Sequence, residues 1–262
     1  MAFVTMTDKS NKKVRVDQLL VDRELAVSRA RAQALIMSGV VFAGEQRLDK
    51  PGHQVSIDLA INLRGKDHPW VSRGGLKLAH GLNHFSIKPE SWTAVDVGAS
   101  TGGFTDVLLS GGASKVYAVD VGYGQLDMKL REDDRVVVLE RTNARYLSPN
   151  HISELVDLVV CDASFIGLRT VLPAALGLTK PEATLVALIK PQFEVGKDRV
   201  GKKGVVRDPE LHEEVCKLVT DWLNARSGWS VVGVCESPIT GPEGNKEFLI
   251  AARKSEPKTL SE

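Results

Sequence analysis

Four charged residues of this 262-residue sequence stand beside apolar runs. Asp162 and Lys190 end the runs LVDLVVCD and ATLVALIK, Glu247 begins the run EFLIAA, and Lys77 lies in SRGGLKL, ahead of these runs. Carboxylate and ammonium groups can move a proton or stabilise a charge that develops on a substrate, and open α/β sheets hold such groups at their strand ends. Each residue alone is usually half of a surface ion pair, so the prediction of a site requires all four to lie together.

A glycine loop supplies the second chemical signal, in the stretch AVDVGASTGGFTDVLLSGG. There an apolar run meets glycines, which let a backbone approach a ligand closely, and continues into a helical pattern. The spacing G-x-x-x-G-G is not the dinucleotide fingerprint, and no Gly-Lys-Ser/Thr follows as in a phosphate-binding P-loop. Asp120 ends the next apolar run, 22 residues after Gly98. Nucleotide-binding α/β folds place at about this distance the acidic residue that accepts hydrogen bonds from ribose hydroxyls.

The elements that must position these residues follow residue 90. Five apolar runs alternate there with helical or turn-rich stretches: TAVDVG, SKVYAVD, RVVVLE, LVDLVVCD and ATLVALIK. Such runs are typical of strands buried on both faces, so the alternation predicts an α/β fold with a doubly wound, largely parallel sheet. Residues 209–225 predict a helix, and the last two apolar runs, WSVVGVCESPI and KEFLIAARK, are expected to close the sheet as an antiparallel pair.

The first quarter of the chain has a different pattern. VDQLLVDREL and SRARAQALIMSG predict two short helices, the second beginning at an N-cap, Ser28, and ending near Gly39. Short runs then alternate around turns at Gly44 and at Pro51-Gly52, as antiparallel strands do. We therefore expect a small α+β domain at 13–66, a linker and first helix at 67–90, the main domain at 91–254 and a polar tail at 255–262.

Composition and charge exclude several classes of protein. With 43% apolar and 26% charged residues, the chain is globular rather than disordered or membrane-spanning. Residues 1–66 hold 11 Lys and Arg against 7 Asp and Glu, whereas the remainder holds 23 against 26. This asymmetry fits an anionic partner for the first domain, and it also fits an ordinary solvated surface.

The cysteines and the N-terminus indicate the compartment. Cys161, Cys216 and Cys235 show neither CxxC nor Cys/His ligand spacing, so we expect no disulfide framework and no zinc site, as is typical of a reducing cytoplasm. The N-terminus lacks the apolar core of a signal peptide, and no uncharged apolar run approaches the roughly 20 residues of a spanning helix. We expect a cytoplasmic protein with no membrane partner.

Taken together, these motifs resemble those of a known family. The glycine loop resembles motif I of Rossmann-like methyltransferases, and the order Lys77, Asp162, Lys190, Glu247 resembles the tetrad of FtsJ-like ribose 2′-O-methyltransferases. SRGGLKL, DVGASTGGFTD, CDASFI, IKPQFEVG, KGVVRD and GPEGNKEFL resemble the TlyA family of ribosomal RNA cytidine 2′-O-methyltransferases, members of which have been called haemolysin A. The first domain is similar to the RNA-binding domain of ribosomal protein S-four, except that 42–45 read Phe-Ala-Gly-Glu where a Val-Asn-Gly turn is common.

The resemblance implies a Rossmann-like sheet with helices on both faces, S-adenosylmethionine as cofactor, ribosomal RNA or ribosomal subunits as partner, and no metal. It implies a catalytic set of Lys77, Asp162, Lys190 and Glu247, in which Lys190 acts on the ribose 2′-oxygen as a neutral base or as a stabilising ammonium. The implied cofactor contacts are Asp96, Gly98, Ala99, Ser100, Thr101, Gly102, Gly103, Phe104, Asp120, Asn143 and Asp162. The expected RNA contacts of the first domain are Arg15, Arg23, Arg29, Arg31, Arg47 and Lys50.

Other interpretations remain open on the sequence. The loop VGKDRVGKKGVVRD could fold over the substrate through Lys197, Arg199, Lys202 and Lys203, or have no binding role. The whole chain could be a ribosome-assembly factor that keeps the cofactor fold without catalysis. A haemolysin would need a membrane segment, and the sequence shows none.

Overall fold

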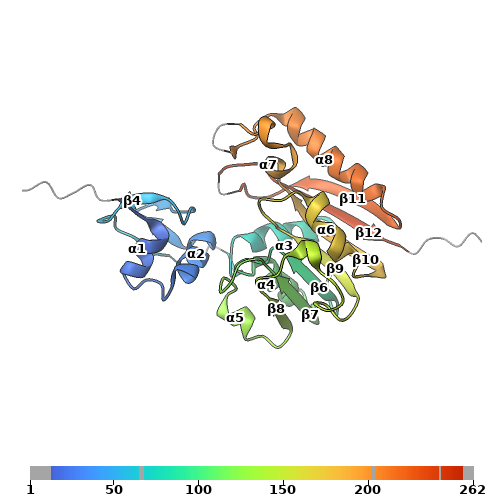
Figure 1. Ribbon diagram of the computed structural model, residues 1–262, viewed down its shortest axis with the longest axis horizontal. Helices are drawn as coiled ribbons and strands as arrows, with labels where there is room; N and C mark the ends of the chain where they lie inside the picture. Colours follow the sequence, from blue (N-terminus) through green and yellow to red (C-terminus); the bar gives the residue numbers. More distant parts are fainter. Residues whose placement is uncertain (1–12, 65–67, 202–203, 242, 256–262) are drawn as a thin grey trace, which may run out of the picture. The chain divides into compact units, whose positions relative to one another are not determined.

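The computed structural model describes residues 13–64, 68–201, 204–241 and 243–255 (Figure 1). The chain divides into two compact units, residues 1–66 and residues 67–262. The first is a small α+β unit, and the second is built on a large, mostly parallel sheet. The predicted fold class is therefore confirmed.

The first unit packs two helices against short strands. Helices α1 (Val16–Asp22) and α2 (Arg29–Met37) bury apolar side chains against each other, and Ser28 caps α2 by accepting a hydrogen bond from the Arg31 amide, as predicted. The strands are β1 (Lys13–Arg15), β2 (Val41–Ala43), β3 (Gln46–Arg47), β4 (Gln54–Ser56) and β5 (Asn62–Leu63). All their pairings are antiparallel, with β2 and β3 joined through Gly44 at φ +58°.

The second unit contains a seven-stranded sheet of order β11-β12-β10-β9-β6-β7-β8. Five strands run parallel: β6 (Thr93–Val97), β7 (Lys115–Val119), β8 (Val136–Leu139), β9 (Val156–Cys161) and β10 (Thr179–Ile189). The predicted antiparallel pair, β11 (Trp229–Glu236) and β12 (Phe248–Lys254), closes the sheet beyond β10. The strand order reverses between β6 and β9, and the carboxyl ends beside such a switch point are where open α/β sheets bind ligands.

Helices cover both faces of this sheet (Figure 1). One face carries α3 (Gly74–His84) and α4 (Gly103–Ser110), with α5 (Met128–Arg131) near the β8 edge. The other carries α6 (Leu168–Leu176) and α8 (Pro209–Asn224), with the short α7 (Pro191–Glu194) between them in the chain. Short 3-10 helices lie at Ala144–Tyr146 and Lys197–Arg199.

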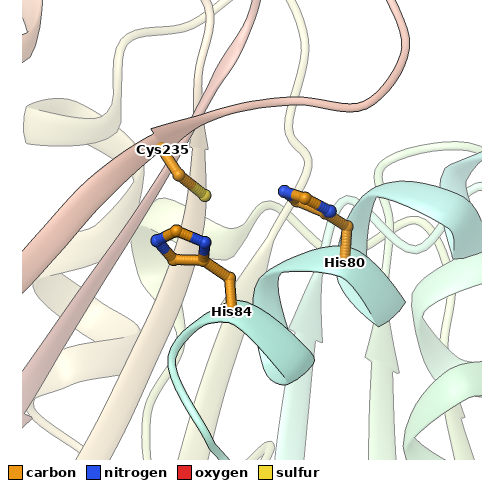
Figure 2. Close-up of side chains that lie close together, drawn as sticks. All are labelled: His80, His84 and Cys235. Atoms are coloured by element: carbon orange, nitrogen blue, oxygen red, sulfur yellow. The ribbon is translucent and has the colours of Figure 1, made fainter.

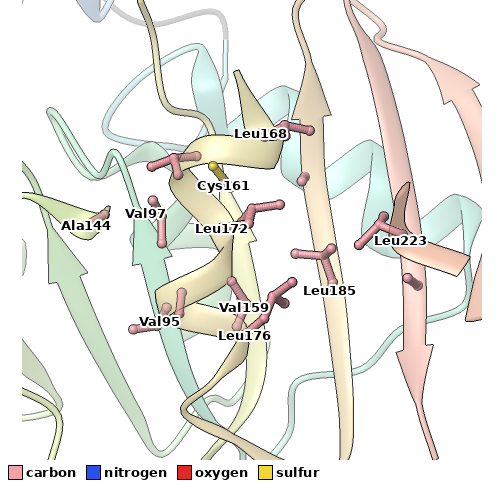
Figure 3. Close-up of a cluster of buried hydrophobic side chains, with 14 of the residues drawn as sticks. Val95, Val97, Ala144, Val159, Cys161, Leu168, Leu172, Leu176, Leu185 and Leu223 are labelled. Carbon is pink, nitrogen blue, oxygen red and sulfur yellow. The ribbon is translucent and has the colours of Figure 1, made fainter. Parts of the chain in front are cut away.

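The sheet core explains the apolar runs. Figure 3 shows Leu168, Leu172 and Leu176 of α6 packed on Val95 and Val159 of the central strands. The predicted helix at 209–225 is α8. It buries His212, Val215, Val219 and Leu223 and leaves Leu211, Leu218 and Trp222 half-buried. The two filled faces hold the strand ends in fixed positions.

Candidate active site

Strand register brings three of the four predicted charged residues to one edge of the sheet, and Lys77 reaches them from α3. Ile189 of β10 pairs with Phe248 of β12, so Lys190 directly follows one strand where Glu247 directly precedes its neighbour. β12 runs antiparallel to β10, and its first residue therefore lies at the carboxyl edge of the parallel strands. Asp162 follows β9, whose Cys161 pairs with Ala187.

The four side chains form a chain of ion pairs. Lys190 Nζ lies 2.6 Å from Asp162 Oδ1, and Lys77 Nζ, from α3, lies 2.7 Å from Glu247 Oε2. Lys77 Nζ also lies 3.6 Å from Asp162 Oδ2, which links the two pairs. Both lysines and Glu247 are buried, whereas the Asp162 side chain keeps 19% of its surface exposed. The tetrad is thus electrically neutral and opens to solvent beside Asp162.

The ion pairs fix the protonation of Lys190. Burial alone would lower its pKa, but the carboxylates of Asp162 and Glu247 outweigh burial and raise the pKa above the usual lysine value. Burial would raise the pKa of Asp162, and the ammonium groups of Lys190 and Lys77 outweigh it in turn, which lowers that pKa. Lys190 is therefore an ammonium group, with two more acceptors at the Asp162 carbonyl (3.0 Å) and Ser164 Oγ (2.9 Å).

Asn245, which the sequence did not single out, holds the segment that presents Glu247. Its side chain is buried; Oδ1 accepts a hydrogen bond from the Val206 amide at 2.9 Å, and Nδ2 donates one to the Gly204 carbonyl at 2.9 Å. Gly241 lies so close that a Cβ there would stand 2.8 Å from Glu247 Oε1. Gly204 and Val206 of KGVVRD thus meet Asn245 of GPEGNKEFL in space, and the only sequence signal for this was an amide residue two positions before Glu247.

The glycine loop lies against the tetrad. Gly98 and Gly102 adopt φ values of +85° and +92°, in the left-handed region that favours glycine. A Cβ on Gly98 would stand 2.8 Å from Ala163 Cα, and the Asp162 amide donates to the Val97 carbonyl at 3.1 Å. The loop and the residue that follows β9 are therefore packed backbone to backbone, which joins the predicted cofactor loop to the predicted catalytic residues.

The predicted cofactor residues divide by exposure. Asp120, Ser100 and Asn143 are half-buried; Asp120 accepts hydrogen bonds from the Ser100 and Gly122 amides, and Asn143 accepts from the Arg145 amide as the N-cap of a 3-10 helix. The rest of the loop after Gly98 is buried: Ala99, Thr101, Gly102, Gly103 and Phe104. Phe104 belongs to the core beneath α3 and α4, which gives it a packing role.

Asp96, next to the last residue of β6, has one buried carboxylate oxygen that lacks a hydrogen-bond partner among the described residues. Its Oδ2 accepts from the Thr105 amide (3.0 Å) and hydroxyl (2.8 Å), whereas Oδ1 is buried with no hydrogen-bond partner in the described part of the chain. Burial, with smaller contributions from the charges of Asp162 and Asp120, raises the pKa of Asp96 to about 7 despite the Thr105 hydrogen bonds. An unpaired buried acceptor beside a glycine loop and a half-exposed Asp120 suits a ligand with a cationic end and ribose hydroxyls.

This raised pKa predicts a pH dependence of stability. The folded protein retains a proton on Asp96 that the unfolded chain loses near pH 4, so stability should fall as pH rises from 5 to 7, by roughly 1.4 kcal/mol per pH unit. Urea unfolding followed by tryptophan fluorescence measures this, because all four tryptophans lie beyond residue 69. D96N should abolish that slope, and an equal slope in both proteins would contradict the prediction.

The structure adds Phe165, which the sequence reasoning missed. Its side chain is 90% exposed, its φ is +65°, and its ring lies 5.3 Å from that of Phe193 between centroids. A non-glycine residue with positive φ is uncommon, and an exposed aromatic ring in the loop that follows Asp162 makes Phe165 a candidate for contact with the substrate. Its place three residues after Asp162 was the available signal, since apolar patterning says nothing of exposure in a loop.

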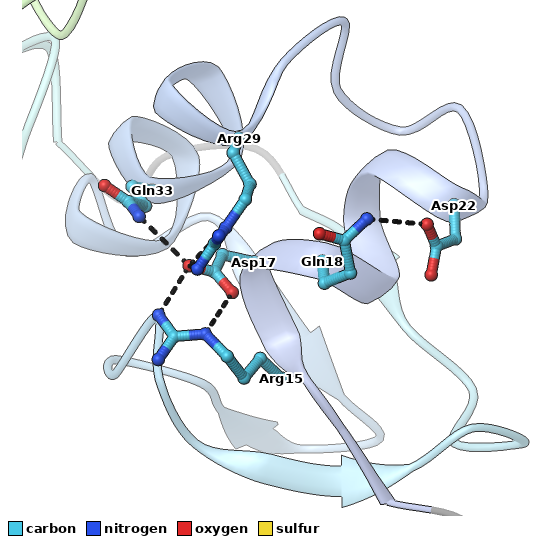
Figure 4. A network of polar contacts seen from close by, with 6 residues as sticks. All are labelled: Arg15, Asp17, Gln18, Asp22, Arg29 and Gln33. Atoms are coloured by element: carbon cyan, nitrogen blue, oxygen red, sulfur yellow. Dashed lines mark hydrogen bonds and ion pairs between the residues drawn. The ribbon is translucent and has the colours of Figure 1, made fainter.

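The arginines of the first unit are largely engaged within it. Figure 4 shows Arg15 and Arg29 directed at the buried carboxylate of Asp17, at 2.7 and 3.3 Å, with Gln33 donating to the same carboxylate at 3.0 Å. Burial would raise the pKa of Asp17, yet Arg15 and Gln33 outweigh it and hold that pKa far below its usual range. The side chains of Arg15 and Arg29 are nevertheless 41% and 52% exposed to solvent.

The remaining predicted RNA contacts differ in their engagement. Arg23 donates to the Leu59 and Ile57 carbonyls, and Arg47 pairs with Asp49 at 3.4 Å. Lys50 is exposed, and Arg31 is half-buried. In the loop after Lys190, Arg199 pairs with Glu214 of α8 at 2.6 Å, whereas Lys202, Lys203 and the Lys197 side chain lie outside the described residues. The structure thus gives several of these cations a structural partner.

Comparison with known proteins agrees with both units. A family model described as FtsJ-like methyltransferase matches residues 70–254, and one described as S4 domain matches residues 14–61. In the described part of the chain, no helix combines the length and the apolar character that crossing a bilayer requires.

Three relatives match along most of their length. The chain is 48% identical over 251 residues to the 16S/23S rRNA (cytidine-2′-O)-methyltransferase TlyA of Mycobacterium tuberculosis, covering 95% of this chain and 93% of that protein. It is 48% identical over 242 residues to the Bacillus subtilis protein provisionally named rRNA methyltransferase YqxC, covering 92% and 86%. A solved Streptococcus thermophilus protein, provisionally named hemolysin, superposes with TM-score 0.71 at 42% identity, covering 94% and 90%. This chain belongs to the FtsJ-like methyltransferase family, in the TlyA group whose methyltransferase domain follows an S4 domain.

Proposed function

We propose that this protein transfers a methyl group from S-adenosylmethionine to the ribose 2′-hydroxyl of cytidine in ribosomal RNA. The observation that carries the proposal is the convergence of Lys77, Asp162, Lys190 and Glu247, from four separate segments, beside the glycine loop. The reaction named for the M. tuberculosis relative supports the nucleotide and the RNA. A ribosomal substrate also implies a cytoplasmic location.

The two units have separate tasks in this proposal. Residues 13–66 form the S4 domain that docks on folded RNA, chiefly through phosphate contacts, since Phe42 is its only aromatic residue. Residues 91–254 carry out the transfer, and 67–90 supply the linker and the helix that bears Lys77. The polar tail at 255–262 is outside both tasks.

The chain's own residues fit the cofactor. S-adenosylmethionine supplies, when bound, a methyl group on a cationic sulfonium. The loop from Gly98 to Gly103 would hold its methionine end, and Asp120 would accept hydrogen bonds from its ribose hydroxyls. Asp162 would place negative charge near its cationic groups, and a cationic ligand would favour the ionised form of Asp96 as well. Asn143, although it caps a 3-10 helix, keeps its amide nitrogen for a further contact.

Lys190 would act on the ribose as an ammonium group. Because its pKa is raised, it is an ammonium group with three N–H donors, all three engaged by Asp162 Oδ1, the Asp162 carbonyl and Ser164 Oγ. By giving up the hydrogen bond to Ser164 Oγ it can donate one to the 2′-oxygen, align it, and stabilise the negative charge that develops as the hydroxyl proton leaves to solvent. Asp162 would orient Lys190, and Glu247 would hold Lys77 so that the second ammonium balances the carboxylate of Asp162. Ser164, a further acceptor for Lys190, completes this positioning.

Phe165 would contact the base of the target nucleotide. An exposed ring fixed three residues after Asp162 can stack on a base that has left its helix, and such stacking contributes about 1–3 kcal/mol per base. F165A should therefore lower methyl transfer to RNA roughly 5- to 150-fold without changing cofactor affinity, whereas F165Y should retain activity. V232A, at another exposed apolar side chain, is the control, and equal losses in V232A and F165A would contradict this role.

The decisive experiment is transfer of labelled methyl from S-adenosylmethionine to purified small and large ribosomal subunits that lack the modification, followed by mapping of the labelled nucleotide. We expect label on a cytidine ribose. A protein that binds the cofactor and RNA but transfers no label to either subunit would overturn the proposal in favour of a non-catalytic assembly factor. Leakage of liposomes caused by the purified protein would favour a haemolysin.

A further inference from the structure

Three potential metal ligands meet on the face of the sheet that α3 covers. His80 and His84 stand one turn apart on α3, and Cys235 faces them from β11 (Figure 2). One nitrogen of each imidazole and the Cys235 sulfur lie within 4.8 Å of one another. The spacing of cysteines and histidines along the chain could not reveal this set, because it joins two distant segments.

A β-bulge aims Cys235 at the histidines. Val231 of β11 pairs with Ala252, whereas Gly233 pairs with Ala251, so Val232 is an additional residue in β11. Before the bulge, Trp229 and Val231 face the core beneath α6 and α8; after it, Cys235 faces the core beneath α3. Side chains alternate between faces of a strand, so without the extra residue Cys235 would point away from α3.

Core packing and strand pairing fix the backbone that carries the three side chains. Phe85, which follows His84, is buried, and its ring lies so near β11 that a Cβ on Gly233 would stand 3.3 Å from it. Cys235 itself pairs with Leu249 inside the sheet. The backbone atoms that carry the three donors therefore hold their separation, while the exposed His84 side chain can rotate.

The donor set suits a borderline divalent cation. Two histidines at i and i+4 on a helix can share one ion, and a thiolate with imidazoles is typical of zinc ligation. Metal–ligand distances of about 2.0–2.3 Å in a tetrahedron place the ligand atoms roughly 3.3–3.8 Å from one another. The three donor atoms lie within 4.8 Å of one another, so side-chain rotations that move them by about 1 Å would close the site. Within the described residues, none of the three side chains is committed to a hydrogen bond, which leaves all three donors available.

We propose that His80, His84 and Cys235 bind one Zn²⁺ ion, with the fourth coordination position open to water. The ion would fasten the second half of α3 to the edge strand β11. Lys77 lies one turn before His80 on the same helix, so the site lies outside the tetrad and stabilises the helix that carries one of its members.

Spectroscopy with Co²⁺ as the probe tests this site on the full-length protein prepared without a histidine tag. One equivalent of Co²⁺ should produce a thiolate-to-metal charge-transfer band, which Zn²⁺ should displace. C235S should abolish the band. H84A, which alters an exposed side chain and leaves the fold intact, should weaken Co²⁺ and Zn²⁺ binding by about tenfold or more.

Matched variants outside the cluster complete the test. C216S, at the half-buried cysteine of α8, and H151A, at an exposed histidine, should bind both ions as the wild type does. Zn²⁺ should raise the unfolding temperature of the wild type, C216S and H151A, and should leave that of C235S unchanged. The absence of a charge-transfer band in the wild type, or a band that survives in C235S, would overturn the proposal.

Discussion

K190A should lower the rate of methyl transfer to ribosomal subunits by about 10²- to 10⁴-fold, the range typical of losing a group that handles a proton or stabilises charge at the reacting atom. Lys190 sits 2.6 Å from Asp162, and Asp162 keeps a second cation, Lys77, at 3.6 Å. In K190A, Lys77 therefore still lies beside the Asp162 carboxylate and balances its charge, so the variant should fold. Single-turnover transfer of labelled methyl, beside calorimetric titration of the cofactor, measures the effect.

Two further variants make the result specific. K180A removes a half-exposed lysine from the same strand, where Lys180 pairs with Asp157 at 2.7 Å, and it should retain full activity. K190R keeps a permanent positive charge that cannot serve as a base. Activity in K190R above that of K190A would support the ammonium role, whereas equal activities would favour the neutral base. Full activity in K190A would exclude Lys190 from the reaction.

D17A should unfold the S4 domain and abolish binding to ribosomal subunits. Asp17 is a buried carboxylate that joins Arg15, Arg29 and Gln33, and each hydrogen bond to a charged group contributes about 1.5–3 kcal/mol to stability. A domain of this size has little stability in reserve. Hydrogen exchange should show loss of protection between residues 13 and 64, while cofactor binding by the second unit stays unchanged.

The direction of the change in RNA affinity distinguishes loss of the folded domain from loss of a charge. D17A removes a negative charge, so binding that depended only on net charge would strengthen. D22A removes the same charge from the same helix, at an exposed residue whose side chain contacts only Gln18 in Figure 4, and it should leave both protection and RNA affinity nearly unchanged. Equal behaviour of D17A and D22A would contradict the structural role of Asp17.

The sequence predicted the elements of the site better than their contacts. Apolar runs that end in Asp162 and Lys190 predict strands with charged ends, because buried parallel strands must be apolar throughout. Nothing local indicates that β12 lies between β10 and β11, which is what brings Glu247 beside Lys190. That placement depends on long-range pairing.

The first unit shows a second limit. The sequence identifies the arginines of the first unit as candidate RNA contacts. It does not show that Asp17 is buried and engages Arg15 and Arg29, because this depends on how α1 packs on α2. Strand β1 was not expected, since three residues offer no alternation to detect. The β-bulge at Val232 likewise cannot be detected in the sequence, yet it determines which face of the sheet Cys235 occupies.

The position of β12 within the sheet has a consequence for synthesis of the protein on the ribosome. Chains emerge from the N-terminus, and domains fold as they become available. The S4 domain can fold early, whereas β10 and β11 must wait with unpaired edges until β12, near the C-terminal end, leaves the exit tunnel and inserts between them. The nascent chain can therefore hold a folded RNA-binding domain before it has an active site, and it acquires Glu247 only with that last insertion.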